Sequence, residues 1–137
     1  MTAFLLDSCA AIWIAGGDPL LEPAASVLPA IDGYEDRLLV SPMTAWEVAM
    51  LTSKGRLAFS LDPEVWFHRL CNLPGVHLAD MPPAVLIASC NLPGSPPADP
   101  VDRIMAATAR AFGYTLVTRD RQLLAYGNEG HMRVMQC

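Results

Sequence analysis

The sequence has few long apolar runs and no clear signal that would send it to or across a membrane. No uninterrupted apolar stretch approaches the ~20 residues that a membrane-spanning helix needs, so we expect no transmembrane segment. The stretch from Met1 to Asp7 lacks the basic residues that open a secretory signal, and Asp7 interrupts its apolar run early. These two absences predict a cytoplasmic protein.

Cysteine and histidine are too few and too scattered to suggest a metal site of their own. The four cysteines form no Cys-x-x-Cys pair, and the three histidines form no pair at the spacing of zinc ligands on a helix. Thiols stay reduced in the cytoplasm, so free cysteines are expected. The sequence therefore argues against both a His/Cys metal site and a disulfide framework.

Positive charge is also scarce. The chain has 9 lysines and arginines against 14 acids, which gives a net charge of −5, and Lys54 is its only lysine. This balance argues against a broad basic surface that grips nucleic acid unaided. It does not exclude nucleic acid as a substrate, because acids gathered around a divalent cation would present a locally reversed field. A small basic segment of a partner protein fits the charge equally well.

What the chain does contain is enough apolar material for one core. Hydrophobic residues make up 53% of the sequence and charged residues 17%, which is typical of globular proteins and not of disordered ones. A length of 137 residues suits one domain, and the turn-rich loop at 92–98 is too short to link two. We expect a single domain over residues 1–137.

Short apolar strands alternate with helices along the whole chain. Strands are predicted at 3–7, 37–41, 76–78, 114–120 and, more weakly, 132–135. Helices are predicted at 9–15, 18–31, 42–51, 64–72, 83–88, 99–112 and 121–127. Ser8 is expected to cap the first helix, and Asp18-Pro19 to open the second, which Pro29 should end or bend. This alternation predicts an α/β fold with a parallel sheet, helices on both of its faces and right-handed crossovers.

Five acids from distant parts of the chain are predicted to reach one rim of this sheet. Asp7 and Asp120 each end a buried strand, where the ligand crevice of an open parallel sheet lies. Asp99 and Asp102 open a helix near the same edge, and Glu47 lies near the second turn of another. Crowded carboxylates repel unless a cation lies among them, and a site with oxygen ligands alone suits Mg²⁺ or Mn²⁺. Phosphodiester hydrolysis is the reaction that fits such a site.

Each of these acids also has a purely structural explanation. Asp99 is more simply a helix cap, because it precedes a proline at the first helical position. Asp102 would favour a helix amino terminus electrostatically. Asp120 could be a turn residue, Asp7 a cap, and Glu47 a solvated helix residue. Their joint placement after apolar strands is what favours a site.

Four polar neighbours have a functional and a structural interpretation as well. Arg103 and Arg119 could contact a phosphate or hold a carboxylate, or they could be ordinary surface arginines. Thr118 and Ser8 could hydrogen-bond a metal-bound water, although residues of their type beside strand ends commonly cap or turn the chain.

Four segments, in order along the chain, resemble the PIN domain family, and most of all its VapC branch, the toxins of prokaryotic type II toxin–antitoxin pairs. The segments are Leu5-Leu6-Asp7-Ser8, Ser41 through Trp46-Glu47-Val48-Ala49, Asp99-Pro100-Val101-Asp102-Arg103 and Thr115-Leu116-Val117-Thr118-Arg119-Asp120. The resemblance covers nearly the whole chain, and the four segments together are specific.

The resemblance implies a three-layer α/β/α fold around a mainly parallel sheet of four to five strands. It also implies an acidic quartet that binds Mg²⁺ or Mn²⁺ and cleaves RNA. The matching positions are Asp7, Glu47, Asp102 and Asp120, with Asp99 as an accessory acid. Related toxins act as homodimers, attack transfer or ribosomal RNA and are silenced by a small antitoxin that occupies the cleft.

The chain departs from the branch at two places. Val101 stands where phenylalanine is frequent, and the segment 95–98 lacks a histidine that is common there. Neither change removes an expected metal ligand. The rim of the cleft, and with it the choice of substrate, is less safely carried over.

Three other functions fit the sequence less well than a nuclease does. A phosphatase with Asp7 as nucleophile usually needs a second acid two residues on, where Cys9 stands. A receiver-like phospho-acceptor domain needs a lysine near the phosphoryl group, and Lys54 lies mid-chain after a helix. A degenerate PIN-like module would bind RNA or a protein without catalysis, and the presence of all four acids argues against it.

Overall fold

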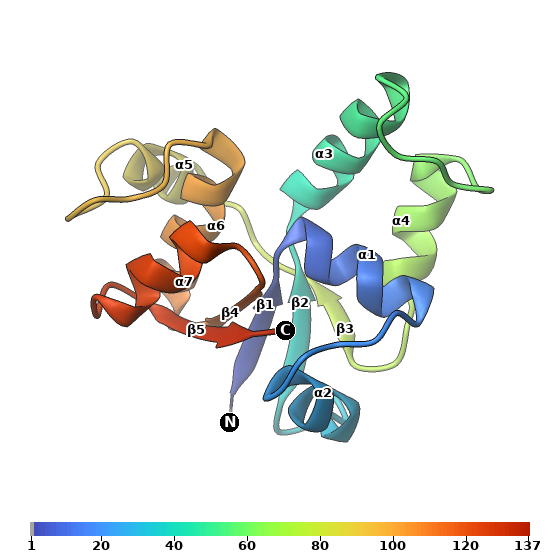
Figure 1. Cartoon of the computed structure of the whole chain (residues 1–137), viewed down its shortest axis with the longest axis horizontal. Coiled ribbons are helices and arrows are strands. Elements are labelled where there is room, and N and C mark those ends of the chain that lie inside the picture. The colour runs from blue at the N-terminus through green and yellow to red at the C-terminus, as the bar shows by residue number, and fades with distance from the viewer. Residues whose placement is uncertain (1) are drawn as a thin grey trace.

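The computed structural model describes residues 2–137, which build one sheet with helices on both faces (Figure 1). The strands are β1 (Ala3–Leu6), β2 (Arg37–Val40), β3 (Val76–Leu78), β4 (Thr115–Thr118) and β5 (Arg133–Gln136). The helices are α1 (Ser8–Gly16), α2 (Ala24–Val27), α3 (Pro42–Ser53), α4 (Pro63–Cys71), α5 (Pro83–Ser89), α6 (Pro100–Phe112) and α7 (Arg121–Asn128), and a short 3-10 turn follows α2 at Leu28–Ala30. In this described part of the chain, no helix has the length and apolar character that crossing a membrane requires.

The sheet has the strand order β3-β2-β1-β4-β5, and every neighbouring pair is parallel. From β1 the chain moves outward to β2 and β3, then returns past β1 to β4 and moves outward again to β5. The direction of winding therefore reverses between β1 and β4, which is where an open parallel sheet binds ligands. The predicted α/β/α fold with a parallel sheet is confirmed.

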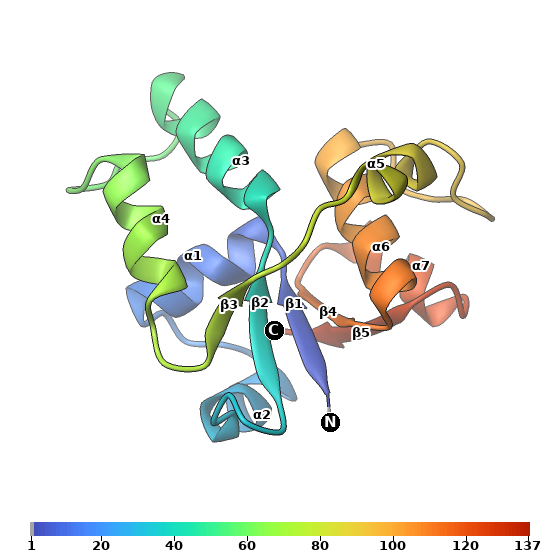
Figure 2. The ribbon, with the colours of Figure 1, turned by 180° about the vertical axis from the view of Figure 1, so that it is seen from behind.

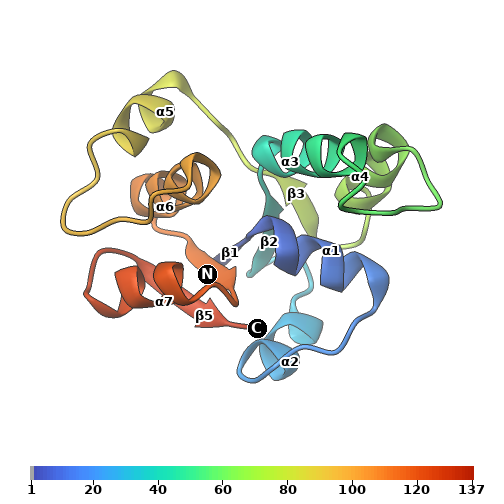
Figure 3. The same ribbon diagram turned by 45° about the horizontal axis from the view of Figure 1, so that its top comes forward.

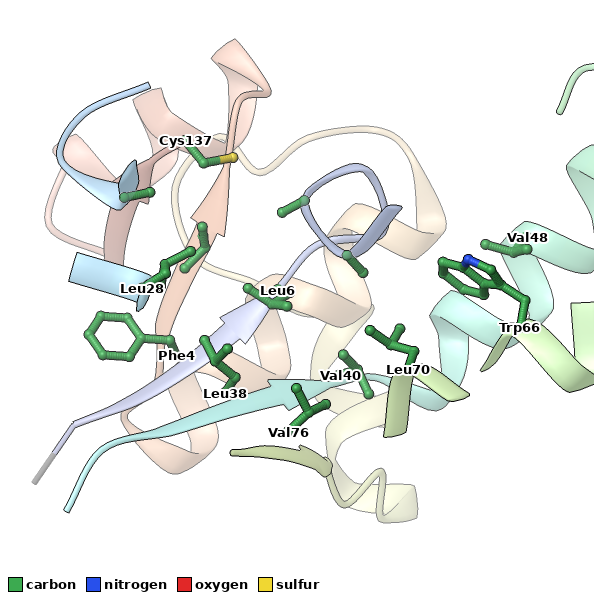
Figure 4. Packing of buried hydrophobic residues seen from close by; sticks show 14 residues of the cluster. Phe4, Leu6, Leu28, Leu38, Val40, Val48, Trp66, Leu70, Val76 and Cys137 are labelled. Carbon is green, nitrogen blue, oxygen red and sulfur yellow. The ribbon is translucent and has the colours of Figure 1, made fainter. Parts of the chain in front are cut away.

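Alternate residues of each central strand enter two separate cores. In β1, Phe4 and Leu6 pack on one face and Leu5 packs on the other. The first core lies under α1, α2 and α4, and Figure 4 shows Leu6, Val40 and Leu70 meeting there. The second core lies under α6 and α7, with α5 packed on α6 (Figure 2). Strands buried on both faces explain why the strand sequences are almost continuously apolar.

The cap of α1 differs from the prediction. Asp7, not Ser8, is the N-cap: its backbone is extended and its Oδ1 accepts a hydrogen bond from the Ala10 amide at 2.7 Å. Ser8 is already helical, and its hydroxyl lies 3.2 Å from that of Thr44 on α3. The expected cap was wrong by one residue because β1 stops at Leu6, which leaves the carboxylate of Asp7 facing the free helix amides.

The predicted helix over 18–31 is also wrong in most of its length. The chain around Leu21 is not helical, because its amide donates to the backbone carbonyl of Cys137 at 3.1 Å. Helix α2 begins only at Ala24, after Pro23, and gives way to the 3-10 turn that contains Pro29. A contact with the far end of the chain thus replaces the first turns of the expected helix.

Candidate metal centre

The five predicted acids all line one hollow at the carboxyl ends of β1 and β4. The hollow has a volume of about 200 Å³. Its lining consists of Asp7, Ser8, Cys9, Glu47, Asp99, Val101, Asp102, Met105 and Asp120. These residues come from the end of β1, the start of α1, the middle of α3, the start of α6 and the end of β4 (Figure 1). The fold therefore brings together acids that lie up to 113 positions apart in the sequence.

Asp7 is the most deeply placed acid, with 7% of its surface exposed. One of its oxygens accepts the Ala10 amide, and the other accepts the hydroxyl of Thr118. Burial raises the pKa of Asp7 above its ordinary value even against these two bonds, and nearby Asp120 and Glu47 raise it further. A carboxylate that is costly to charge, held in a fixed orientation, is suited to receiving a cation.

The hydroxyl of Thr118 joins the two strand ends that carry acids. It donates its single proton to Asp7 and accepts the backbone amide of Asp120 at 3.0 Å. Thr118 is fully buried. Its proton is therefore engaged in orienting Asp7, whereas the sequence suggested contact with a metal-bound water.

Asp99 and Asp120 each cap a helix with one oxygen. Oδ2 of Asp99 accepts the Asp102 amide at 2.9 Å, at the start of α6. Oδ1 of Asp120 accepts the Leu123 amide at 2.9 Å, at the start of α7. In each case the second carboxylate oxygen takes no part in the cap. The structural and the metal-binding roles are therefore compatible in both residues.

The pKa of Asp102 shows how strongly the acids are crowded. Its pKa is raised to about 7, mainly by burial and then by the charges of Asp99, Asp120, Asp7 and Glu47, in that order. Among residues 2–137, no lysine or arginine forms an ion pair with any of these five carboxylates. The protein itself thus leaves this negative field without a cation.

The two arginines near the acids are directed elsewhere. The Arg103 guanidinium donates to the backbone carbonyls of Ser89 at 2.9 Å and Pro97 at 3.3 Å. Arg119 donates to the carbonyl of Cys137 at 3.0 Å and lies 3.9 Å from the centre of the Trp13 ring. Both arginines hold backbone segments in place, which the sequence alone did not suggest.

Sequence reasoning missed two residues of this region. Cys9 lines the hollow, and burial together with the charge of Asp7 raises the pKa of its thiol to about 11. Thr44 pairs with Ser8 and so ties the start of α1 to α3, one turn before Glu47. The available signals were spacings: Cys9 follows Asp7 by two residues, and Thr44 precedes Glu47 by three.

The sequence is similar to a known protein family along most of its length. The sequence matches the family model of the PIN domain over residues 4–129. The chain belongs to the PIN domain family. Ribonuclease VapC22 of Mycobacterium tuberculosis (strain ATCC 25618 / H37Rv) is 35% identical to this PIN domain over 126 residues, which cover 92% of this chain and 93% of that protein.

Solved structures share the fold of this PIN domain along almost its full length. The crystal structure of VapBC2 from Rickettsia felis, bound to a DNA fragment from their promoter, matches with a TM-score of 0.70 at 12% identity and covers 98% of both chains. DNA-bound VapBC from Salmonella typhimurium matches with a TM-score of 0.61 at 21% identity, over 99% of this chain and 98% of that one. At these identities the likeness concerns the fold alone.

The donor chemistry of this PIN domain suits a hard divalent cation. As the side chains lie, no three His, Cys, Asp or Glu residues among residues 2–137 form a ready-made ligand set. The hollow nevertheless offers carboxylate oxygens from four separate elements, and the raised thiol pKa keeps Cys9 protonated near neutral pH. Oxygen ligands without thiolate or imidazole are those of Mg²⁺ and Mn²⁺.

Proposed function

We propose that this chain, as a single domain over residues 1–137, is a metal-dependent endoribonuclease and the toxin of a toxin–antitoxin pair. The observation that carries the proposal is the crowding of Asp7, Glu47, Asp102 and Asp120 around one hollow, where no lysine or arginine of residues 2–137 pairs with them. Family membership and the likeness to Ribonuclease VapC22 support RNA as the substrate. We also propose that the protein acts in the cytoplasm.

In this proposal the four acids hold Mg²⁺ or Mn²⁺, and Asp99 assists them. A bound divalent ion would activate a water near neutral pH and stabilise the charge that develops on the phosphate. Asp7 contributes an oxygen whose direction is fixed by Thr118. Asp102 contributes a carboxylate that accepts no hydrogen bond from residues 2–137, so it is free to turn toward the ion. Arg103 acts at a distance, because it anchors the segment that leads into Asp99 and Asp102.

The proposed partners are a cognate antitoxin, an RNA substrate and a second copy of the chain. The VapBC structures that share the fold support the antitoxin. The surface offers sites for protein partners, because several large apolar side chains are well exposed, among them Trp46 (54%), Leu78 (54%) and Ile87 (67%).

RNA cleavage by the purified protein tests this proposal. We expect structured RNA to be cut in Mg²⁺ or Mn²⁺, and the activity to disappear in EDTA. Asp7→Asn should also abolish it while keeping the cap of α1, because asparagine caps helices as well as aspartate does. Asp62→Asn is the matched control, since Asp62 caps α4 outside the hollow. Full activity in Asp7→Asn would exclude the proposed site.

Calorimetric titration with Mn²⁺ separates the enzyme from a PIN-like module that binds without catalysis. The wild type should bind Mn²⁺ and Asp102→Ala should bind it much more weakly. Equal heats for the two proteins, together with absence of cleavage, would favour the binding module.

A further inference from the structure

A second hollow lies directly beside the acidic one and has a different chemistry. Its volume is about 350 Å³, within the range of small-molecule sites. One wall is the segment 95–98, which leads into Asp99, and the other wall is α7, which follows Asp120. The two segments lie side by side at one end of the molecule (Figures 1 and 3). A chain bound across the acids could therefore continue into this hollow.

The loop wall of this hollow is held in a fixed conformation. The hydroxyl of Tyr126 donates to the carbonyl of Pro93 at 2.7 Å, and Arg103 donates to that of Pro97. The ring of His131 packs so closely on Gly94 that a Cβ there would collide with it. Pro97 is buried. The hollow is thus preformed and does not depend on a mobile loop closing.

The lining combines flat apolar surface with free hydrogen-bonding groups. Pro96, Ala98 and Ala125 supply the accessible apolar part. The amide of Gln122 and the hydroxyl of Ser95 make no hydrogen bond with any residue in 2–137, and the Glu129 carboxylate has only a His131 nitrogen at 3.6 Å. Gln122 and Glu129 lie seven positions apart on one face of α7, about 10 Å along its axis.

We propose that this hollow is a base-binding subsite that receives the nucleotide next to the scissile phosphate, with Gln122 and Glu129 as the residues that determine specificity. This inference rests on the proposed ribonuclease function and adds a preference among RNA bases to it. The apolar walls suit the faces of a base, as in the recognition of unpaired RNA. Glu129 can only accept hydrogen bonds, and Gln122 both donates and accepts. Guanine presents two adjacent donors, N1–H and its 2-amino group, to a single carboxylate, and its O6 can accept from the Gln122 amide, so the pair favours guanine over the other bases.

Mononucleotide binding tests the subsite without catalysis. The probes are the four ribonucleoside 5′-monophosphates, added to the ¹⁵N-labelled full chain in EDTA and followed by NMR. We expect shifts at the Gln122 side-chain amide and at residues 95–98, with affinity about tenfold higher for the guanosine nucleotide than for the other three. Gln122→Ala and Glu129→Gln should each remove this discrimination. Arg121→Ala, an exposed change on α7 outside the hollow, should not.

Cleavage of an RNA with randomised sequence, followed by sequencing of the ends, provides the second measurement. The wild type should prefer guanine at one position beside the cut, and the two subsite variants should lose that preference. Equal binding of all four nucleotides, shifts confined to other surfaces, or an unchanged preference in the variants would overturn the subsite. Base-selective shifts here with no RNA cleavage would instead overturn the ribonuclease and leave the subsite standing.

Discussion

Replacing Asp102 by asparagine should stabilise the metal-free protein above neutral pH while it destroys metal binding. Burial and four neighbouring acids raise the pKa of Asp102 from 3.8 to about 7. Because the pKa is higher in the folded than in the unfolded protein, the associated stability is complete below about pH 4 and is lost as the pH rises through about 7. Above that range the wild type carries an unfavourable charge that asparagine lacks.

The size of the effect follows from the same pKa. A rise from 3.8 to about 7 corresponds to about 4 kcal/mol for a fully buried carboxylate. Asp102 is only partly buried, so solvent screening reduces this to about 2 kcal/mol. Its charge also favours the amino terminus of α6, and losing that costs about 0.5–1 kcal/mol. The net gain at pH 8 is about 1 kcal/mol, or about 3 °C in Tm.

Thermal unfolding followed by circular dichroism in EDTA measures this gain. At about pH 3.5, below the pKa of an unfolded aspartate, wild type and Asp102→Asn should unfold within about 1 °C of each other, because Asp102 is then mostly protonated in both the folded and the unfolded protein. At pH 8 the variant should unfold higher, and Mn²⁺ should reverse the order by stabilising only the wild type. Glu35→Gln, an exposed change outside the hollow, controls for net charge. The same difference at both pH values would refute the argument that crowding destabilises the charged form.

Three further substitutions test the roles of Thr118, Gly127 and Asp120. Thr118→Val should cost about 1–3 kcal/mol of unfolding free energy and lower RNA cleavage about tenfold or more, because Asp7 loses a buried donor, and Thr118→Ser should restore both. Gly127→Ala should cost about 1–3 kcal/mol in urea unfolding, because the new methyl collides with Val134, and adding Val134→Ala should recover most of it. Asp120→Asn keeps the cap of α7 and should unfold within about 0.5 kcal/mol of wild type, yet bind Mn²⁺ much more weakly by calorimetry.

The strands and the sheet could be predicted because their signals are local and strong. Each central strand is four residues long and contains at least two consecutive aliphatic residues, since both of its faces are buried. The helix over 18–31 failed for the opposite reason. Its apolar residues do have helical spacing. However, the backbone hydrogen bond from Leu21 to Cys137 joins residues 116 positions apart, and the sequence near Leu21 gives no signal of it.

The membership of the acidic hollow was predictable, while the way its residues are held was not. Acids at the carboxyl ends of parallel strands must share an edge, so Asp7 and Asp120 could be paired from the sequence. The hydroxyl pair of Ser8 and Thr44 and the bond from Thr118 to Asp7 depend on how strands and helices are placed in space. Such contacts between distant residues cannot be predicted from the spacing of residues along the sequence.

The structure shows that several of the acids proposed to bind metal also cap helices. Asp7, Asp99 and Asp120 cap α1, α6 and α7, so three helix amino termini with their partial positive charge open on one hollow. These termini offset part of the repulsion among the acids and let the cluster exist in the folded chain before a cation arrives. Asp62 caps α4 in the same manner but stands apart from the other acids. Capping alone therefore does not distinguish Asp7, Asp99 and Asp120 from Asp62; our proposal for them rests on the meeting of several caps where the sheet reverses its winding.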